Sequence, residues 1–298
     1  MQAAAPQRVG ALPWPPGWPG PRLDALLSAA LGEDLGSGDV TSEACQAGGQ
    51  RARAVLLVKQ PGVLAGLPLA ARVFALVDPD LTWRALAGDG RVITASPEAV
   101  AEVAGGAHAI LAAERVALNL VQRLSGIATL TARCVEVAAG RADILDTRKT
   151  TPGLRWLERY AVRVGGGRNH RFGLSDGILI KDNHVRAAGG VGAAVRLARS
   201  RGPQGLRVEV ECTDLAEVEE ALAAGAELIL LDNMDPAQLT AAVGRIAGRA
   251  RTEASGGVHL GNLAAVVATG VDAVSMGMLT HSAPALDLSL ELQLGGAV

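Results

Sequence analysis

The sequence predicts an α/β protein with a β/α barrel, or an open barrel, in its C-terminal half. After Gly140 one unit repeats: a short run of apolar and β-branched residues, a loop, and an alanine-rich helical stretch. Such apolar strands are typical of parallel sheets covered by helices. No Gly-x-Gly-x-x-Gly pattern follows a predicted strand, which disfavours a doubly wound dinucleotide-binding fold.

The first part of the chain predicts a mixed α/β domain over residues 22–133, preceded by a proline-rich arm over residues 1–21. We expect a helix near Leu23 to Leu31 and strands at Ala52 to Lys59, Leu81 to Ala87 and Arg91 to Ala95. From His108 to Arg133 apolar residues recur at intervals of three, four and seven. This spacing predicts a long helix with one buried face.

Residues 134–285 then form the predicted barrel domain. Its strands are expected at Ala142 to Asp146, Gly177 to Lys181, Leu206 to Glu211, Glu227 to Asp232, Arg251 to Glu253 and Val271 to Ser275. Helix starts are marked by Asp214, by Asp235 before Pro236, and by Asn262. Gly225 and Gly270 supply helix stops.

Composition excludes several classes of protein. With 49% hydrophobic and 19% charged residues in 298, the chain is globular. A net charge of -2 gives no global basic field for nucleic acid or an anionic membrane. The longest stretch without Asp, Glu, Lys or Arg, 254–271, contains glycines, Ser255 and Asn262, which indicates a loop, a helix and a turn and not a membrane span. Three widely spaced cysteines and a proline-interrupted N-terminus predict a cytoplasmic protein without a signal peptide.

Polar residues gather where the predicted strands end, which is where β/α barrels carry their chemistry. The strand ends lead into Asp146-Thr147-Arg148-Lys149, Lys181-Asp182-Asn183-His184, Glu209 and Glu211, Asp232-Asn233, Ser255-Gly256-Gly257, and Met276-Gly277. Between Arg141 and Arg186 there are ten Lys or Arg against five Asp or Glu. A solvated basic face explains such a run equally well. Lysine usage favours a chemical role for this cluster over a solvated basic face, because two of the three lysines, Lys149 and Lys181, lie in it.

Two small-residue segments, Ser255 to Gly257 and Met276 to Met278, follow the last strands and would let backbone N–H groups approach a phosphate. Each segment alone is more often a plain turn. Glu211 and Asp232 could hold Mg²⁺, directly or through water, or bind ribose hydroxyls, or be ordinary rim carboxylates. His170 and Arg171 lie on a glycine-rich approach to the rim, where His170 is a ligand or a surface histidine.

Long stretches of the chain resemble the quinolinate phosphoribosyltransferases. The segments that carry the resemblance are DTRKTTPGLR from Asp146, GGGRNHRFGLSDGILIKDNH from Gly165, LILLDN from Leu228 and EASGGV from Glu253. In the N-terminal half they are GEDLGSGDVTS from Gly32 and AERVALNLVQRLSGIAT from Ala113. The resemblance runs from about Leu31 to Leu290.

This resemblance implies a type II phosphoribosyltransferase fold: an N-terminal α/β sandwich domain and an incomplete β/α barrel, with residues 286–298 packing back on the N-terminal domain. The implied reaction joins quinolinate to phosphoribosyl pyrophosphate with Mg²⁺ and gives nicotinate mononucleotide, pyrophosphate and CO2, in NAD biosynthesis. The implied assembly is a homodimer.

The resemblance also implies roles for single residues. Arg148, His170, Arg171 and Lys181 would hold the quinolinate carboxylates, with Arg115 reaching in from the partner subunit. Lys149, beside Thr147 in the same motif, would lie between the two substrate sites. Glu211 and Asp232 would serve the ribose and Mg²⁺, and Ser255, Gly256 and Gly257 with Met276, Gly277 and Met278 would cradle phosphate.

Two rival functions are weighed against this one. A molybdenum-operon paralogue shares the fold and much of the motif set, but retention of Arg115 and the other charged residues favours the quinolinate enzyme. A non-catalytic phosphometabolite-binding barrel would bind phosphate without turnover, and Glu211 and Asp232 would then be dispensable.

Overall fold

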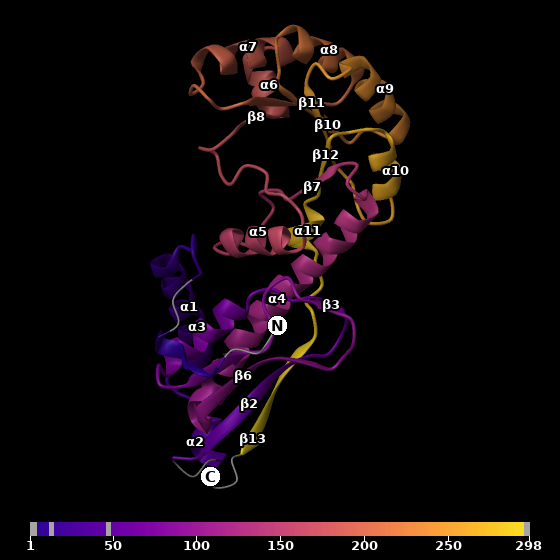
Figure 1. Ribbon diagram of the computed structural model, residues 1–298. Coiled ribbons are helices and arrows are strands. Elements are labelled where there is room, and N and C mark those ends of the chain that lie inside the picture. The colour runs from indigo at the N-terminus through magenta and orange to yellow at the C-terminus, as the bar shows by residue number, and fades with distance from the viewer. Residues whose placement is uncertain (1–4, 12–14, 46–48, 295–298) are drawn as a thin grey trace. The chain divides into compact units, whose positions relative to one another are not determined.

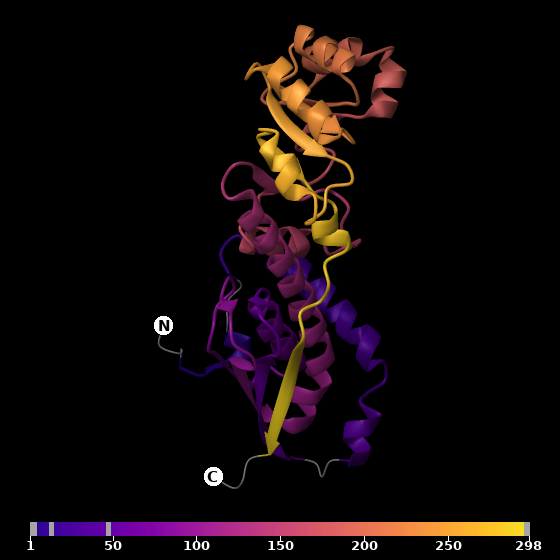
Figure 2. The ribbon, with the colours of Figure 1, turned by 90° about the vertical axis from the view of Figure 1, so that its right-hand side faces the viewer.

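The computed structural model describes residues 5–11, 15–45 and 49–294. Two compact units make up the chain: residues 1–129 with 283–298, and residues 130–282. The border between them falls within the long helix α4 (Ala107–Ala138). Figures 1 and 2 show the elements of each unit from two sides.

The N-terminal unit is built on a five-stranded antiparallel sheet in the order β1-β4-β6-β2-β13. These strands are β1 (Gln7–Arg8), β2 (Arg51–Val58), β4 (Thr82–Ala85), β6 (Glu98–Gly106) and β13 (Leu288–Leu294). A separate pair joins β3 (Gly62–Val63) to β5 (Val92–Ile93). The helices are η1 (Val9–Ala11), α1 (Gly20–Leu35), α2 (Val40–Cys45), α3 (Leu67–Val77) and α4.

Packing in this unit follows the apolar periodicity of the sequence. Along β2 every second residue, from Ala52 to Val58, is buried, as expected for a strand with one face on a core. Helix α4 adds side-chain hydrogen bonds, because Thr129 Oγ1 accepts from the N–H of Val63 at 2.8 Å and Ser125 Oγ from that of Ala65 at 2.9 Å. The predicted long helix is confirmed.

Sequence patterns missed part of this unit. The strand expected at Arg91 to Ala95 is only the two-residue β5, and helix α3 and strand β6 were not foreseen. Strand β6 reads EAVAEVAGG, and Ala, Glu and Gly are poor strand formers, so its pairing with β2 and β4 decides its conformation. In the proline-rich segment, β1 pairs with β4 and Val9 is buried.

The C-terminal unit contains a six-stranded, wholly parallel sheet in the order β7-β12-β11-β10-β9-β8. Its strands are β7 (Asp143–Leu145), β8 (Ile178–Ile180), β9 (Val208–Cys212), β10 (Leu228–Asp232), β11 (Arg251–Ser255) and β12 (Ala273–Ser275). The first strand therefore pairs with the last, while β7 and β8 do not pair with each other. This arrangement confirms the predicted open β/α barrel, visible in Figure 1.

Helices connect these strands, as the repeat predicted. They are α5 (Arg155–Val164), α6 (Asp182–Ala188), α7 (Val191–Arg201), α8 (Leu215–Ala223), α9 (Pro236–Ile246), α10 (Leu263–Ala268) and α11 (Met278–His281). Asp214 and Asp235 cap α8 and α9 through their carboxylates. Asn262 precedes α10 but makes no cap bond; its side chain instead accepts from the N–H of His259 at 2.8 Å.

Cys45, Cys134 and Cys212 are free thiols. Burial raises the pKa of Cys134 to about 11, and burial with nearby carboxylates raises that of Cys212 to about 12. Within the described residues, every helix is too short or too polar to cross a bilayer.

Candidate active site

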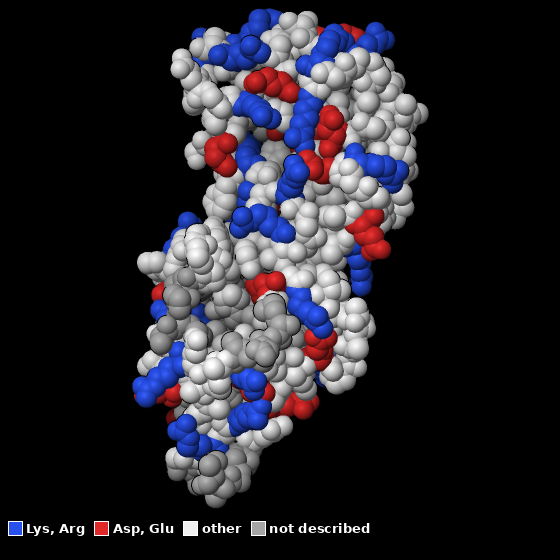
Figure 3. Space-filling view, in the orientation of Figure 1, with Lys and Arg blue, Asp and Glu red and all other residues white. Residues whose placement is uncertain are grey.

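A cavity of about 770 Å³ lies at the carboxyl ends of the barrel strands. Most residues expected to bind substrate line it together: Thr147, Arg148, Lys149, His170, Arg171, Lys181, Glu211, Asp232, Ser255, Gly256 and Gly257. Residues far apart in sequence meet here because the carboxyl ends of parallel strands share one edge of the sheet. On the face seen in Figure 3, cationic and anionic side chains of this unit lie next to each other.

Four predicted residues do not line this cavity. Arg115 belongs to α4 in the N-terminal unit, with 57% of its side chain exposed and Glu114 at 3.9 Å. Met276 is buried, and Gly277 lies against Lys149, since a Cβ on Gly277 would approach Lys149 Cδ to 2.9 Å. Met278 begins α11.

A buried ion pair positions the segment that carries His170 and Arg171. Asp146 Oδ1 accepts from Arg159 Nη1 at 3.1 Å and from the N–H of His170 at 2.8 Å. Arg159 also donates to the carbonyl oxygens of His170, at 2.5 Å, and Arg171, at 3.0 Å. Asn169 donates to the other carboxylate oxygen of Asp146. These bonds place Arg171 at the cavity wall.

Arg148 and Arg171 are the two guanidinium groups of the cavity that form no ion pair within the described part of the chain. The Nε atom of each is buried and has no hydrogen-bond partner there. Burial and the positive charge of Arg148 lower the pKa of Arg171. Arg171 Nη1 donates to the carbonyl of Gly177 at 3.0 Å. The remaining N–H groups of these two guanidinium groups, which repel each other, suit a ligand with two carboxylates.

Lys181 forms an ion pair with Glu211, and both line the cavity. Asp232, on the next strand, accepts a hydrogen bond from its neighbour Asn233 at 2.7 Å. Glu211 and Asp232 are two carboxylates at adjacent strand ends, which fits Mg²⁺ as usually bound, by one or two carboxylates with water and substrate phosphates.

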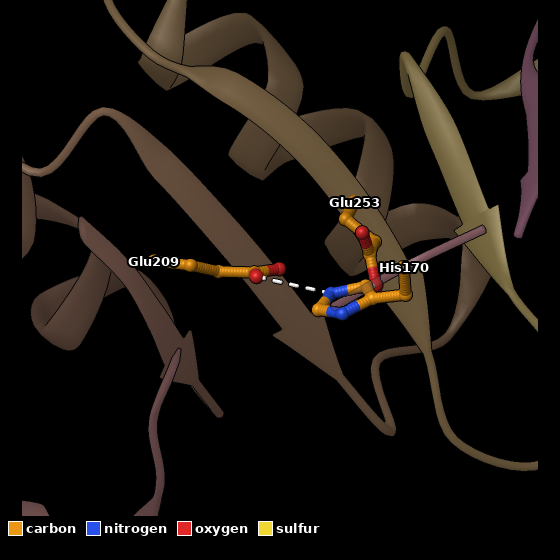
Figure 4. A group of neighbouring side chains, drawn as sticks. All are labelled: His170, Glu209 and Glu253. Carbon is orange, nitrogen blue, oxygen red and sulfur yellow. Dashed lines mark ion pairs between the residues drawn. The ribbon is translucent and has the colours of Figure 1, made fainter. Parts of the chain in front are cut away.

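His170 lies between two buried carboxylates, Glu209 on β9 and Glu253 on β11 (Figure 4). Its Nε2 is 3.0 Å from Glu209 Oε2 and 3.7 Å from Glu253 Oε1. Its Nδ1 accepts the N–H of Arg171 at 2.7 Å. Both ring nitrogens are thus engaged by the protein, so in this arrangement His170 offers no free N–H to a carboxylate ligand.

Burial and neighbouring charges shift the pKa values of His170 and Glu253. Burial lowers the pKa of His170, but the hydrogen bond and charge of Glu209 outweigh burial and raise it. Burial and the charge of Glu209 raise the pKa of Glu253 to about 7. The bond accepted at Nδ1 opposes protonation of the ring, because a protonated Nδ1 cannot accept it. Because Nδ1 accepts the N–H of Arg171, the ring proton that faces Glu209 lies on Nε2.

The loop after β11 has a shape that depends on glycine. Gly256 has φ +85°, and a Cβ there would lie 2.2 Å from Asn233 Oδ1. Gly257 has φ +61° but open space around it. The N–H of Asn233 donates to the carbonyl of Ser255 at 2.9 Å, which joins this loop to the one after β10.

Comparison with known protein families agrees with this architecture. The N-terminal domain of quinolinate phosphoribosyl transferase matches residues 39–125, and its C-terminal domain matches residues 127–291. The chain belongs to the quinolinate phosphoribosyltransferase family.

Relatives of the chain match along nearly its whole length. The probable nicotinate-nucleotide pyrophosphorylase (carboxylating) of Synechocystis sp. is 46% identical, over 91% of this chain and 92% of that protein. The corresponding protein of Bacillus subtilis is 44% identical, over 92% and 94%. The crystal structure of NadC from Streptococcus pyogenes has a TM-score of 0.89 at 44% identity, over 96% of this chain and 100% of that one.

Sequence reasoning gave no role to Glu253, Glu209, Asp146 or Arg159. A signal for Glu209 was present, because side chains two residues apart on a strand face the same side, and Glu209 precedes Glu211 by two. Glu253 precedes Ser255 in the same way. For Asp146 and Arg159 no sequence signal distinguishes a buried pair from rim charges.

Proposed function

We propose that this protein is a carboxylating nicotinate-nucleotide pyrophosphorylase. It transfers the phosphoribosyl group of phosphoribosyl pyrophosphate to quinolinate and releases nicotinate mononucleotide, pyrophosphate and CO2, a step of NAD biosynthesis. The observation that carries the proposal is the pair of guanidinium groups, Arg148 and Arg171, that form no ion pair with any described residue, in a cavity also lined by Lys149 and Lys181. Family membership favours this function over the molybdenum-operon and non-catalytic alternatives.

The cations bring two anionic substrates together. Arg148 and Arg171 hold the dicarboxylate by charge-assisted hydrogen bonds. Lys149, whose carbonyl accepts from Thr280 Oγ1 at 2.7 Å, lies between the dicarboxylate and the pyrophosphate and reduces their repulsion. His170 supports this site chiefly by accepting the N–H of Arg171.

Attack of the pyridine nitrogen on C1 of the ribose passes through a state with positive charge on the sugar. Glu211 and Asp232, at neighbouring strand ends of the cavity, stabilise that charge. The same two carboxylates would hold Mg²⁺, which neutralises the pyrophosphate leaving group when bound. The loop of Ser255, Gly256 and Gly257 would bind a phosphate group through backbone N–H groups, together with Met276 to Met278 at the next strand end.

Two further features belong to the proposal. The enzyme acts as a homodimer in which the exposed Arg115 of one subunit completes the site of the other. Its compartment is the cytoplasm, since three unbridged thiols suit a reducing environment.

The test is turnover by purified protein. Quinolinate, phosphoribosyl pyrophosphate and Mg²⁺ are mixed with the protein, nicotinate replaces quinolinate in a parallel reaction, and CO2 and nicotinate mononucleotide are followed. Turnover with quinolinate and none with nicotinate is expected. Binding of phosphate by folded protein without turnover would favour the paralogue or the binding barrel.

A further inference from the structure

We propose that Glu253 is the proton donor of the decarboxylation: its carboxyl group supplies the hydrogen that replaces the departing carboxylate at C2 of the pyridine ring. This inference rests on the proposed function, because it assigns a residue to the second half of that reaction. It is carried by the position of Glu253, by its neighbours and by an unsatisfied carboxylate oxygen.

Glu253 lies in the wall between two cavities. One is the substrate cavity at the carboxyl ends of the strands. The other, of about 550 Å³, lies at their amino ends, where Asp143, Arg207 and Arg251 line it. Glu253 lines both. A group in this place can donate a proton toward substrate and regain one from water on the other side.

The geometry of the cluster leaves a proton on Glu253. The side chains of Glu209 and Glu253 are 7% and 4% exposed, and each has an oxygen within 4.8 Å of the other. Two buried carboxylates this close do not both ionise without a cation. The Nε2–H of the imidazole between them faces Glu209 at 3.0 Å and lies 3.7 Å from Glu253. Glu253 is thus the carboxyl group farther from the ring N–H, and its raised pKa agrees with a retained proton.

Glu253 Oε1 is buried and has no hydrogen-bond partner within the described residues. A buried polar atom without a partner is costly in a folded protein, so its retention in the cavity wall points to a ligand. A metal ion is the less suitable ligand, because a protonated Nε2 on His170 cannot coordinate it.

Once the ring nitrogen is bonded to the ribose, the ring cation accepts electron density at C2. As the bond from C2 to its carboxylate breaks and CO2 leaves, the electron pair of that bond takes up the proton of Glu253 in the same step. A C2–H bond forms with the proton of Glu253, and the resulting carboxylate takes a proton from water.

The experiment measures pyrophosphate and CO2 separately for Glu253→Gln. An amide keeps the size of the side chain and its hydrogen-bonding capacity but cannot donate a proton. We expect pyrophosphate still to form, while CO2 per pyrophosphate falls at least about tenfold and the phosphoribosylated dicarboxylate accumulates. Glu219→Gln, which makes the same change on the outer surface, is the control and should keep the ratio near that of wild type.

If wild type does not turn over quinolinate, the proposed function fails. If wild type is active and Glu253→Gln loses pyrophosphate and CO2 in the same proportion, or loses neither, Glu253 is not the donor. Should the variant not fold, Glu253→Asp replaces it, because it keeps the acid but shortens its reach: CO2 formation should slow and the first pyrophosphate release should not. Equal slowing of both, or of neither, overturns the proposal.

Discussion

At the scale of the residue, Arg148 shows how an unpaired charge predicts a ligand. Its Nε is buried without a hydrogen-bond partner among the described residues, whereas Lys181 in the same cavity is paired with Glu211. A guanidinium in this state is stabilised when a carboxylate arrives, and only the dicarboxylate substrate has carboxylates.

Arg148→Ala should therefore weaken quinolinate binding far more than phosphoribosyl pyrophosphate binding. Loss of a charge-assisted bond costs roughly 1.5 to 3 kcal/mol, or about 10- to 150-fold in affinity. Calorimetric titration with each substrate measures both effects. Arg245→Ala, which removes an exposed arginine paired with Glu219 at 3.2 Å, is the control and should change neither. Equal loss of both affinities would remove Arg148 from the dicarboxylate site.

Glu253 predicts a pH dependence of stability. Burial and the charge of Glu209 raise its pKa from 4.5 to about 7 in the folded protein. The folded state therefore binds this proton more tightly than the unfolded chain does. Its contribution to stability is complete below pH 4.5 and is lost as the pH rises to about 7, with a slope of at most about 1.4 kcal/mol per pH unit.

The glutamine variant lacks this titration. Urea unfolding of wild type and Glu253→Gln at several pH values should show wild type losing stability relative to the variant between pH 5 and 7. His170 and Glu209 are present in both proteins, so the difference isolates Glu253 and its coupling to them. A difference that does not change with pH would contradict the assignment of a raised pKa.

At the scale of the element, two neighbouring glycines in the loop between β11 and α10 differ in the space around them. Gly256→Ala would force a Cβ to within 2.2 Å of the Asn233 side chain and 2.8 Å of its backbone nitrogen. Gly257→Ala meets open space and carries only left-handed strain, about 1 kcal/mol.

The first substitution should raise the KM for phosphoribosyl pyrophosphate about tenfold or more, because a shift of this loop misplaces groups that contact substrate. The second should leave this KM within a few-fold of wild type and lower thermal stability slightly. Steady-state kinetics and thermal unfolding of both variants make the comparison. A larger effect at Gly257 would mean that steric contact with Asn233 does not govern the loop.

At the scale of the whole molecule, the proposed exchange of Arg115 between subunits has a direct test. Arg115→Ala and Lys149→Ala should each be inactive alone. The two variants are then mixed, unfolded and refolded together. If Arg115 acts on the partner's cavity, a mixed dimer holds one native site, because the Arg115→Ala subunit keeps Lys149 and its partner supplies Arg115. A one-to-one mixture should then recover about a quarter of wild-type activity.

If Arg115 acts within its own chain, every site in the mixture lacks one of the two residues and activity stays absent. Refolded wild type provides the reference for recovery. Size-exclusion chromatography of each variant checks that a dimer forms.

The sequence by itself determined the repeat of strands and helices, the caps at Asp214 and Asp235, and the set of charged residues at strand ends. These follow from local chemistry: apolar periodicity, side-chain capping and the alternation of faces along a strand. Strand β6 was not predicted, because its Ala- and Gly-rich sequence has little intrinsic preference for a strand conformation. Its pairing with β2 and β4 makes it a strand.

Only the tertiary structure decided how the charges pair. Parallel pairing of β7 with β12 brings Asp143 to Arg251 and Lys149 to Thr280, residues that are distant in sequence. It also pairs Lys181 with Glu211, leaves Arg148 unpaired, and buries Glu209 and Glu253 on either side of His170. Coulomb energies and desolvation depend on distance and burial in space, and neither quantity can be read from the order of residues along the chain.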